Sequence, residues 1–263
     1  MLQLRSTLHR TKASQLVWHS PMANGLQLRL AQDKEELKAI QRLRFKIFSE
    51  EMNAVFPDSP NGLDADQFDA WCDHFMVMDQ TKDKVVGTYR FLSPENARLA
   101  GDYYSASEFD LQPLAGIRDQ LVEVGRSCIH PKYRTGAVIM LLWSGIADLM
   151  RQGGYRYLLG CASVSLRDDG VTAAKVWREA QRMQQKVDTD LPQLQPLHRY
   201  PVEKLNSHLP AKIPPLIKGY LNLGAVICGE PAWDPDFNTA DFPVLLDLQR
   251  LDPRYKRHFG LED

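Results

Sequence analysis

The feature that most constrains this fold is a strand, a basic turn and a long apolar helix that follow one another within residues 121–153. The apolar run LVEVGRSCIH ends at Pro131, and the basic turn after it closes at Gly136. The next segment, VIMLLWSGIADLMRQ (138–152), is apolar on nearly every side, which is typical of a helix packed against a sheet. Gly153-Gly154 ends that helix, and YRYLLGCASVS (155–165) predicts the following strand. The pattern therefore predicts a β-sheet with a buried helix on one face.

The remaining sequence extends this unit into a mixed α/β fold. Asp33 is placed to cap a helix whose apolar residues from Leu37 to Phe48 recur at helical spacing. The other expected elements are strands at 26–30, 74–78 and 85–92, a loop at 55–69, helices at 171–188 and from Pro215, and two closing strands, AVICGE and FPVLLDL. We therefore expect one α/β (α+β) domain over residues 25–263, with a central mixed β-sheet and helices on both faces.

Composition and charge exclude several classes of protein. The net charge of −1 gives no reason to expect a nucleic-acid partner, and the longest apolar stretch is too short to span a bilayer. The four cysteines stand far apart with no CxxC pair, which indicates a reduced compartment. Cys72 and His74 form a C-x-H pair, but a stable site needs about four ligands, so we assign them to packing and expect no metal.

The first 24 residues are expected to form a flexible basic arm. No acidic residue precedes Asp33, whereas Arg5, Arg10, Lys12 and Arg29 do. The segment lacks the continuous apolar core of a signal peptide, which indicates a cytoplasmic protein. We expect the arm to hold the protein peripherally on the anionic surface of the inner membrane.

The strand at 121–130 carries two charges inside an apolar run. Glu123 and Arg126 are three residues apart, so on a regular strand their side chains point to opposite faces. They would then need different partners, unless a β-bulge near Gly125 turns one of them.

Several motifs of the chain resemble known acyltransferases. Strand, proline, basic turn and apolar helix together resemble the GNAT superfamily, which binds a pyrophosphate with the loop Arg/Gln-x-x-Gly-x-Gly/Ala at this position. A second set consists of Arg44, Asp64, Asp66, Asp69, Arg90, Phe109, Glu123 and Arg126. This set resembles the charged framework of the acyl-homoserine-lactone synthases.

Seven longer motifs follow one another between about residues 28 and 250. They are LRFKIFSEEM (43–52), CDHFMV (72–77), VVGTYRF (85–91), YYSASEFDL (103–111), VEVGRSCIHPKYR (122–134), LLWSGIADL (141–149) and PPLIKGYLNLGAVICGEPAWDPDFNTADF (214–242). In wording and order these motifs are most similar to the ornithine Nα-acyltransferases, sometimes labelled hemolysin-like.

The resemblance implies a GNAT-like acyltransferase fold and three catalytic residues, Glu123, Arg126 and Tyr220. Glu123 is the candidate base for the acceptor amine, because acylation needs a neutral amine and a carboxylate can take its proton. The alternative is a structural ion pair of Glu123 with Arg126 or Arg90. Tyr220 stands where GNAT enzymes place an acid for the leaving thiolate, and core packing is its alternative role.

The resemblance also implies residues that bind the two substrates. The expected substrate-binding residues are Arg44, Asp64, Asp66, Asp69, Arg90, Phe109 and Ser163. The three aspartates could hold a side-chain ammonium directly, or could anchor the loop to the arginines. Ser163 lies in GCASVS, which is no nucleophile elbow, so covalent catalysis is not expected. Phe91, Phe109 and the helix at 138–150 are candidates to line a groove for the acyl chain.

The donor is expected to dock at the turn that precedes the long helix. The residues assigned to the phosphopantetheine and its carrier are Lys132, Arg134, Gly136 and Ala137, with Arg254, Lys256 and Arg257 as further basic residues. Here the glycine pattern of the loop is degraded to RTGAVI (134–139), which favours acyl carrier protein over coenzyme A.

The expected function is an N-acyltransferase that moves a (3-hydroxy) fatty acyl chain from acyl carrier protein to the α-amine of an amino acid. L-Ornithine is the expected acceptor and a lyso-ornithine lipid the expected product, without metal or redox cofactor. The alternatives are an acyl-homoserine-lactone synthase or another N-acyl amino acid synthase, and a membrane-active, non-enzymatic protein. The last is disfavoured because the chain has no spanning segment and no long basic amphipathic helix.

Overall fold

The computed structural model describes residues 22–23, 25–52, 54–56, 61–185, 192–206 and 208–261. The expected arm at residues 1–24 lies outside these ranges, except for Met22–Ala23, which form strand β1 and pair with β2 (Leu26–Leu30). Strand β1 therefore belongs to the sheet, although its residues fall within the segment assigned to the arm. None of the helices in these ranges has the length and apolar character that a bilayer crossing requires.

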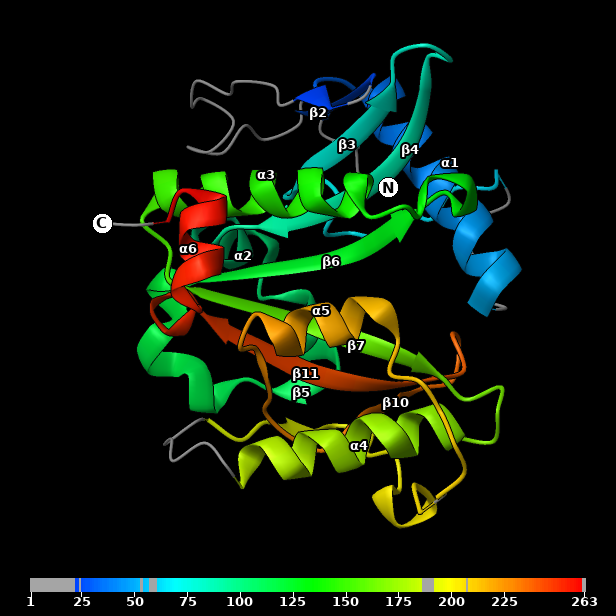
Figure 1. Ribbon diagram of the computed structural model, residues 1–263, viewed down its shortest axis with the longest axis vertical. Coiled ribbons are helices and arrows are strands. Elements are labelled where there is room, and N and C mark those ends of the chain that lie inside the picture. Colours follow the sequence, from blue (N-terminus) through cyan, green and yellow to red (C-terminus); the bar gives the residue numbers. More distant parts are fainter. Residues whose placement is uncertain are drawn as a thin grey trace.

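The core is a nine-stranded sheet with the order β1-β2-β3-β4-β6-β7-β11-β10, in which β9 pairs with β11 (Figure 1). Its other strands are β3 (Asp73–Asp79), β4 (Lys84–Leu92), β6 (Leu121–Ile129), β7 (Tyr157–Ser165), β9 (Val226–Ile227), β10 (Ala232–Asp234) and β11 (Thr239–Asp247). A separate two-stranded sheet joins β5 (Phe109–Asp110) to β8 (Gln195–Pro196). Among the described strands, β6 and β7 form the only parallel pair, so the expected mixed sheet is confirmed.

Helices cover both faces of this sheet. The α-helices are α1 (Lys34–Met52), α2 (Pro94–Ala100), α3 (Ala137–Gly153), α4 (Val171–Gln184), α5 (Pro215–Asn222) and α6 (Pro253–Phe259). The described residues also form short 3₁₀ helices, which are η2 (Tyr104–Ser107), η3 (Gln112–Gln120), η4 (Pro131–Tyr133), η5 (Val202–Lys204) and η6 (Leu248–Arg250). Helices α2 and α6 were not expected from the apolar pattern.

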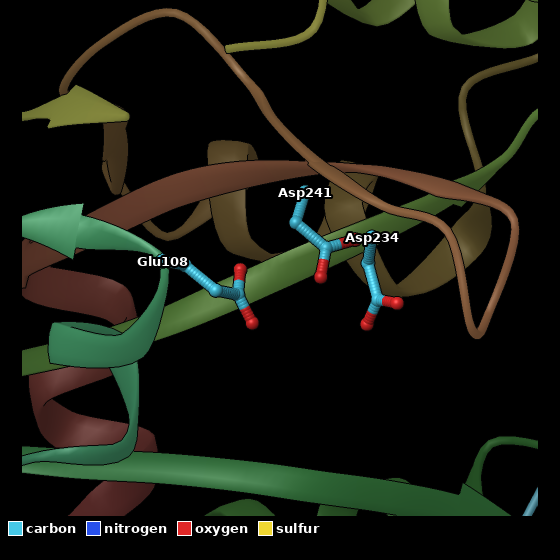
Figure 2. Close-up of side chains that lie close together, drawn as sticks. All are labelled: Glu108, Asp234 and Asp241. Atoms are coloured by element: carbon cyan, nitrogen blue, oxygen red, sulfur yellow. The ribbon is translucent and has the colours of Figure 1, made fainter. Parts of the chain in front are cut away.

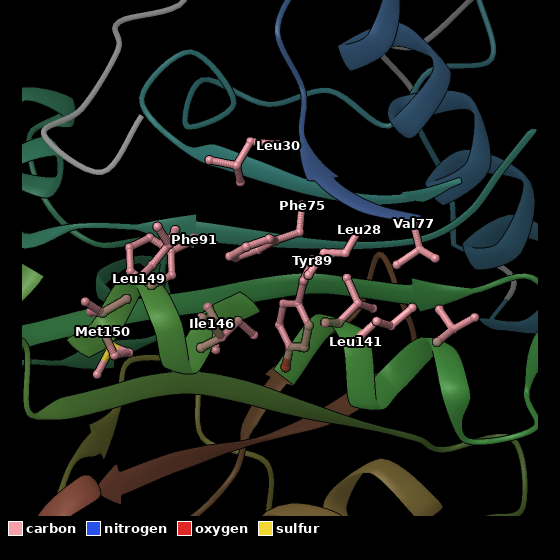
Figure 3. Close-up of a cluster of buried hydrophobic side chains, with 14 of the residues drawn as sticks. Leu28, Leu30, Phe75, Val77, Tyr89, Phe91, Leu141, Ile146, Leu149 and Met150 are labelled. Atoms are coloured by element: carbon pink, nitrogen blue, oxygen red, sulfur yellow. The ribbon is translucent and has the colours of Figure 1, made fainter. Parts of the chain in front are cut away.

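The alternation of side chains along the strands separates the two faces. Phe75 and Val77 of β3 pack in the cluster beneath α3 (Figure 3), whereas the neighbouring Met76 and Met78 pack against α1. Every residue of β3 is buried, as expected for a strand covered on both sides. We call the sides the α3 face and the α1 face. Helices α4 and α5 share the α3 face, because Trp143 of α3 packs against their cluster as well.

Candidate active site

The candidate site lies where β6 and β7 part. Their parallel pairing covers only Leu121–Glu123 against Tyr157–Leu159, and the two strands then diverge (Figure 1). A cavity of about 260 Å³ is lined by both strands in the region of their divergence, together with residues of β4, α5 and the β10–β11 hairpin. Gly160 allows the close approach at the point of divergence, because a Cβ there would lie 2.8 Å from the carbonyl oxygen of Val124.

The cavity extends through the sheet from one face to the other. Val124 and Leu158 line it and pack with the α3 face, whereas Glu123 and Cys161 line it and belong to the α1 face. Two substrates can therefore approach one point from opposite sides of the sheet.

A network of six charged side chains closes the α1 face beside the cavity. Arg44 Nε lies 2.9 Å from Asp64 Oδ2, and its Nη2 lies 2.8 Å from Asp69 Oδ2. Arg90 Nη1 reaches Asp66 Oδ2 at 2.6 Å and Asp69 Oδ1 at 3.0 Å. Arg126 completes the network with longer contacts, 3.5 Å to Asp64 and 3.3 Å to Asp66. Three guanidinium groups thus neutralise three carboxylates, and they fix the loop that precedes β3.

The network is buried, so the loss of one of its charges should lower the stability of the fold. Arg44 has no exposed surface and Asp69 is 3% exposed. Burial raises the pKa of Asp69, but its interactions with Arg44, His74 and Arg90 outweigh this effect and hold the pKa well below its usual range. His74 contributes as a neutral ring, because burial lowers its pKa to about 4, and its Nε2 lies 2.9 Å from the Asp69 carbonyl oxygen.

The three aspartates bind the arginines of the network. Arg44 and Arg90 pair with this loop, as expected. Asp64 and Asp69 are buried and form salt bridges with arginines, whereas Arg90 and Arg126 line the cavity in place of their aspartate partners. The structure thus places these aspartates as loop anchors, with no oxygen of theirs on the cavity wall for a substrate ammonium.

Glu123 faces the same side of the sheet but takes no part in the network. Its Oε2 accepts from the Tyr104 backbone N–H at 2.6 Å, and its Oε1 accepts from the Ser105 N–H at 2.8 Å and from the Ser105 hydroxyl. Neither Arg90 nor Arg126 forms a salt bridge with it in the described part of the chain, so the expected alternative of an ion pair is wrong. Burial raises the pKa of Glu123. Each carboxylate oxygen accepts about two bonds, so Oε2 keeps one position for the cavity.

A β-bulge gives Arg126 its orientation. Thr88 of β4 pairs with Cys128 and Arg90 pairs with Gly125, so β6 spans this interval with one residue more than β4. Arg126 itself has a φ of 51°, in the left-handed region. The extra residue turns the Arg126 guanidinium to the α1 face, where the Glu123 side chain also lies. The sequence predicted this shared face only if a bulge occurred near Gly125.

Tyr220 lines the cavity from α5, opposite the α1 face. Its hydroxyl forms a short hydrogen bond with the hydroxyl of Tyr89 on β4. Burial raises the pKa of Tyr89 to about 12 and that of Tyr220 well above its usual value. Both phenols therefore stay protonated at neutral pH and can donate.

The other expected binding residues divide into two groups. Ser163 lies on the cavity wall as expected. Phe109 is 1% exposed and packs with Leu111 and Leu114 in a core cluster of the α1 face, so it is a core residue. Phe91 is buried beneath α3 in the same way.

The expected donor residues occupy the turn before α3. Gly136, with a φ of 96°, precedes the first residue of the helix, Ala137. Lys132 is exposed, and Arg134 pairs with Glu51 at 2.7 Å. The basic residues of α6, by contrast, lie toward the opposite end of α3 (Figure 1), so they do not form one surface with Lys132.

Sequence reasoning missed a second group of acids at the cavity. Glu108, Asp234 and Asp241 converge from η2 and the β10–β11 hairpin (Figure 2). They are scattered over more than 130 positions, with Glu108 in the motif YYSASEFDL (103–111) and both aspartates in the motif at 214–242, and neither motif indicates that they meet. Only the folding of the hairpin over η2 brings them together.

The charge network predicts a large loss of stability on substitution of Asp69. Asp69→Asn should lower the free energy of unfolding by about 3–5 kcal/mol, because it leaves buried guanidinium groups without their counter-ion. The control is Asp119→Asn, which breaks the exposed pair with Arg98 and should cost no more than about 1 kcal/mol. Urea unfolding of both variants measures the difference, and equal losses would contradict the assigned role of the network.

Comparison with known proteins agrees with this architecture. Residues 43–144 match the family model described as acetyltransferase (GNAT) domain. The crystal structure of the AHL synthase LasI superimposes with a TM-score of 0.50 at 12% identity, covering 89% of this chain and 94% of that one. At this identity the likeness shows the fold alone, and it confirms the expected GNAT-like fold.

Two curated relatives are similar over nearly the whole chain. The L-ornithine N(alpha)-acyltransferase of Brucella abortus (strain 2308) is 35% identical over 90% of this chain and 90% of its own. The protein of the same name from Rhodobacter capsulatus is 34% identical over 89% of this chain and 94% of its own. The chain is therefore an acyltransferase, and it belongs to the L-ornithine Nα-acyltransferase family.

Proposed function

We propose that this protein transfers a fatty acyl chain from acyl carrier protein to the α-amine of L-ornithine. The observation that carries the proposal is the cavity between β6 and β7, which joins a polar, charged end on the α1 face to an apolar end on the α3 face. An amino acid suits the first end and an acyl thioester the second. The names of the relatives supply ornithine as the acceptor.

The reaction is an aminolysis of a thioester. The α-nitrogen attacks the carbonyl carbon, the C–S bond breaks, and one proton leaves the amine while the thiolate gains one. We assign the first proton to Glu123, whose Oε2 keeps a free acceptor position, and the second to the hydroxyl of Tyr220. We assign the binding of the acceptor's α-carboxylate to Arg126. Its contacts with the aspartates are the longest in the network, so its guanidinium is the one best able to take a further partner. No electron is transferred, so the proposed reaction needs no redox cofactor.

The apolar chain of the donor needs a dry space beside the Tyr89–Tyr220 pair. A second cavity of about 60 Å³ adjoins these two tyrosines and is lined otherwise by apolar residues of α3, α5, α6 and the end of β11. Trp143, Ile146 and Met150 supply the α3 side, which is the helix expected to line such a groove. We propose that a 3-hydroxy fatty chain enters here and that the product is a lyso-ornithine lipid.

Substitution of Glu123 tests the function and the base together. A bacterial host that lacks ornithine lipids should accumulate lyso-ornithine lipid, seen by mass spectrometry, when it expresses the wild type. Purified Glu123→Gln should show a kcat lower by roughly 10²–10⁴, because the amide cannot take the proton. Absence of the lipid with a folded wild type would refute the proposed function.

A control variant distinguishes two roles of Glu123, which are proton transfer and the binding of η2 through hydrogen bonds. Ser105→Ala removes one hydrogen bond to Glu123 and leaves its carboxylate, so its kcat should fall by less than about tenfold. If Ser105→Ala lowers kcat as far as Glu123→Gln does, Glu123 acts by holding η2 and is not the base.

Acyl carrier protein is acidic, and a positive surface at the start of α3 suits it. Lys46, Lys84, Lys132 and Arg134 all lie near His130, whose pKa is lowered by partial burial and by these four charges. All four side chains are exposed. We propose that the carrier docks here and presents its phosphopantetheine to the α3 face of the cavity.

Charge reversal on this surface predicts a donor-specific defect. Lys132→Glu should raise KM for acyl carrier protein roughly 3–10-fold at low salt, with a smaller effect at high salt, and should leave KM for ornithine unchanged. The matched control is Lys256→Glu on α6, at the other end of α3, which should behave as wild type. An equal effect of the two substitutions in steady-state kinetics would place the docking surface elsewhere.

We also propose that the protein works in the cytoplasm at the anionic surface of the inner membrane, because its product is amphipathic and every charged residue before Asp33 is basic. Deletion of residues 1–20 leaves β1 in place and should reduce sedimentation with phosphatidylglycerol vesicles without change in the melting temperature. Unchanged sedimentation of the truncated protein would exclude the arm as the membrane contact.

A further inference from the structure

Three carboxylates that form no salt bridge with any described residue converge at the polar end of the cavity. Glu108 follows η2, Asp234 ends β10 and Asp241 lies on β11 (Figure 2). One oxygen from each lies within 4.8 Å of the others. Asp234 and Asp241 line the cavity itself. We call these three residues the carboxylate cluster.

The cluster lacks the partners that buried carboxylates normally have. Asp241 is 3% exposed, and its buried Oδ1 has no hydrogen-bond partner in the described part of the chain. Neither side-chain oxygen of Glu108 has a hydrogen bond of normal geometry there, although Cys161 and Tyr104 lie close enough to oppose the rise of its pKa. Asp234 Oδ1 accepts from the backbone N–H groups of Asp236 and Phe237, which leaves its other oxygen. The orphaned oxygens are acceptors that a donor from outside the chain can satisfy.

The carboxylate cluster also lacks a positively charged partner among the described residues. In the six-residue network every carboxylate meets a guanidinium, whereas no lysine or arginine among the described residues forms a salt bridge with the cluster. Burial, together with Asp241 and Asp234, raises the pKa of Glu108 to about 9, and burial and Asp234 raise that of Asp241 to about 6. At neutral pH Glu108 therefore keeps its proton in the free protein, and a cation bound at the cluster would favour its ionised form.

We infer that Glu108, Asp234 and Asp241 bind the side-chain ammonium of the amino-acid acceptor, an inference that rests on the proposed function. An ammonium donates three hydrogen bonds toward the corners of a tetrahedron, so acceptors at about 2.8 Å from the nitrogen lie about 4.6 Å apart. The spacing of the cluster fits this arrangement. The cluster thus selects a diamino acid over amino acids with neutral side chains.

The surroundings suit the rest of such an acceptor. The Arg126 guanidinium lies 4.9 Å from the centre of the Tyr104 ring and 5.6 Å from that of Phe237. Tyr104 lies four residues before Glu108, and Phe237 is bonded through its N–H to Asp234. Both rings contact the cation, line the cavity and belong to the segments that carry Glu108 and Asp234, so they offer an apolar wall for methylene groups whose two ends are a carboxylate and an ammonium.

The test compares ornithine with norvaline, which has the same carbon chain without the terminal amine. With wild-type enzyme and acyl carrier protein as donor carrier, kcat/KM for ornithine should exceed that for norvaline by at least about 100-fold. Asp241→Asn and Glu108→Gln should each reduce this ratio at least tenfold, mainly through KM for ornithine. Asp236→Asn, an equal charge change at an exposed position of the same hairpin, should preserve the ratio.

Thermal melting supplies the second measurement. Ornithine without donor should raise the melting temperature of the wild type and not that of Asp241→Asn, whereas norvaline should raise neither. Asp241→Asn alone should melt at or above the wild-type temperature, because it removes repulsion between like charges. A lower melting temperature would show that the cluster supports the fold, and would overturn the inference.

The remaining outcomes are distinguishable. If the wild type acylates ornithine and the variants keep the full ratio, the inference fails while the proposed function stands. If the wild type acylates no ornithine, the proposed function fails. If millimolar CaCl₂ or MgCl₂ raises the melting temperature of the wild type but not of Asp241→Asn, the cluster is a metal site, and the inference is overturned.

Discussion

The early parting of β6 and β7 is the constraint on which the rest of the structure depends. Two parallel strands that pair over three residues and then separate leave backbone groups facing a gap, and such groups need partners. A gap inside a sheet persists only where groups outside the strand pairing form hydrogen bonds with these backbone N–H and C=O groups. The walls of this gap are built by α5 and the β10–β11 hairpin on one side and by β4 on the other. Because the gap crosses the sheet, it joins the apolar interior beneath α3 to the charged interior beside α1.

Charge is divided at this gap into two groups with opposite properties. The arginine–aspartate network is internally neutral, and each of its carboxylates forms a salt bridge with a guanidinium, so it holds its loop against the sheet. In the described part of the chain the carboxylate cluster has no cationic partner, and buried oxygens of Glu108 and Asp241 have no hydrogen-bond partner. Buried charges of the first kind cost stability when one partner is removed, whereas those of the second kind already carry a cost in the free protein. Tyr104 and Phe237 pack against Arg126, which forms no salt bridge with the cluster in the described part of the chain.

Local patterns predicted most of the sheet and little of the site. The strands at 26–30, 74–78, 85–92 and 121–130 and the buried helix after them were foreseeable because period and turn residues act locally. Helices α2 and α6 were missed although each begins with a capping Ser or Asp followed by proline, a signal outside the apolar pattern. The pairing of the arginines with the loop aspartates was foreseeable from charge and resemblance. The partners of Glu123 were not, because η2 has no periodicity that places it under β6, and the carboxylate cluster depends wholly on tertiary contacts.

The bulge at Arg126 shows how local strain is maintained by the charges around it. A left-handed conformation costs a residue other than glycine roughly 1–2 kcal/mol, and Gly125 stands one position before the place where that conformation occurs. A glycine at 126 would remove the strain but would also remove the guanidinium from Asp64 and Asp66. The strained conformation is therefore retained because it turns the side chain onto the α1 face, where Glu123 already points. A regular strand would have carried Arg126 beneath α3, among apolar side chains, and left the acceptor end of the cavity without a cation.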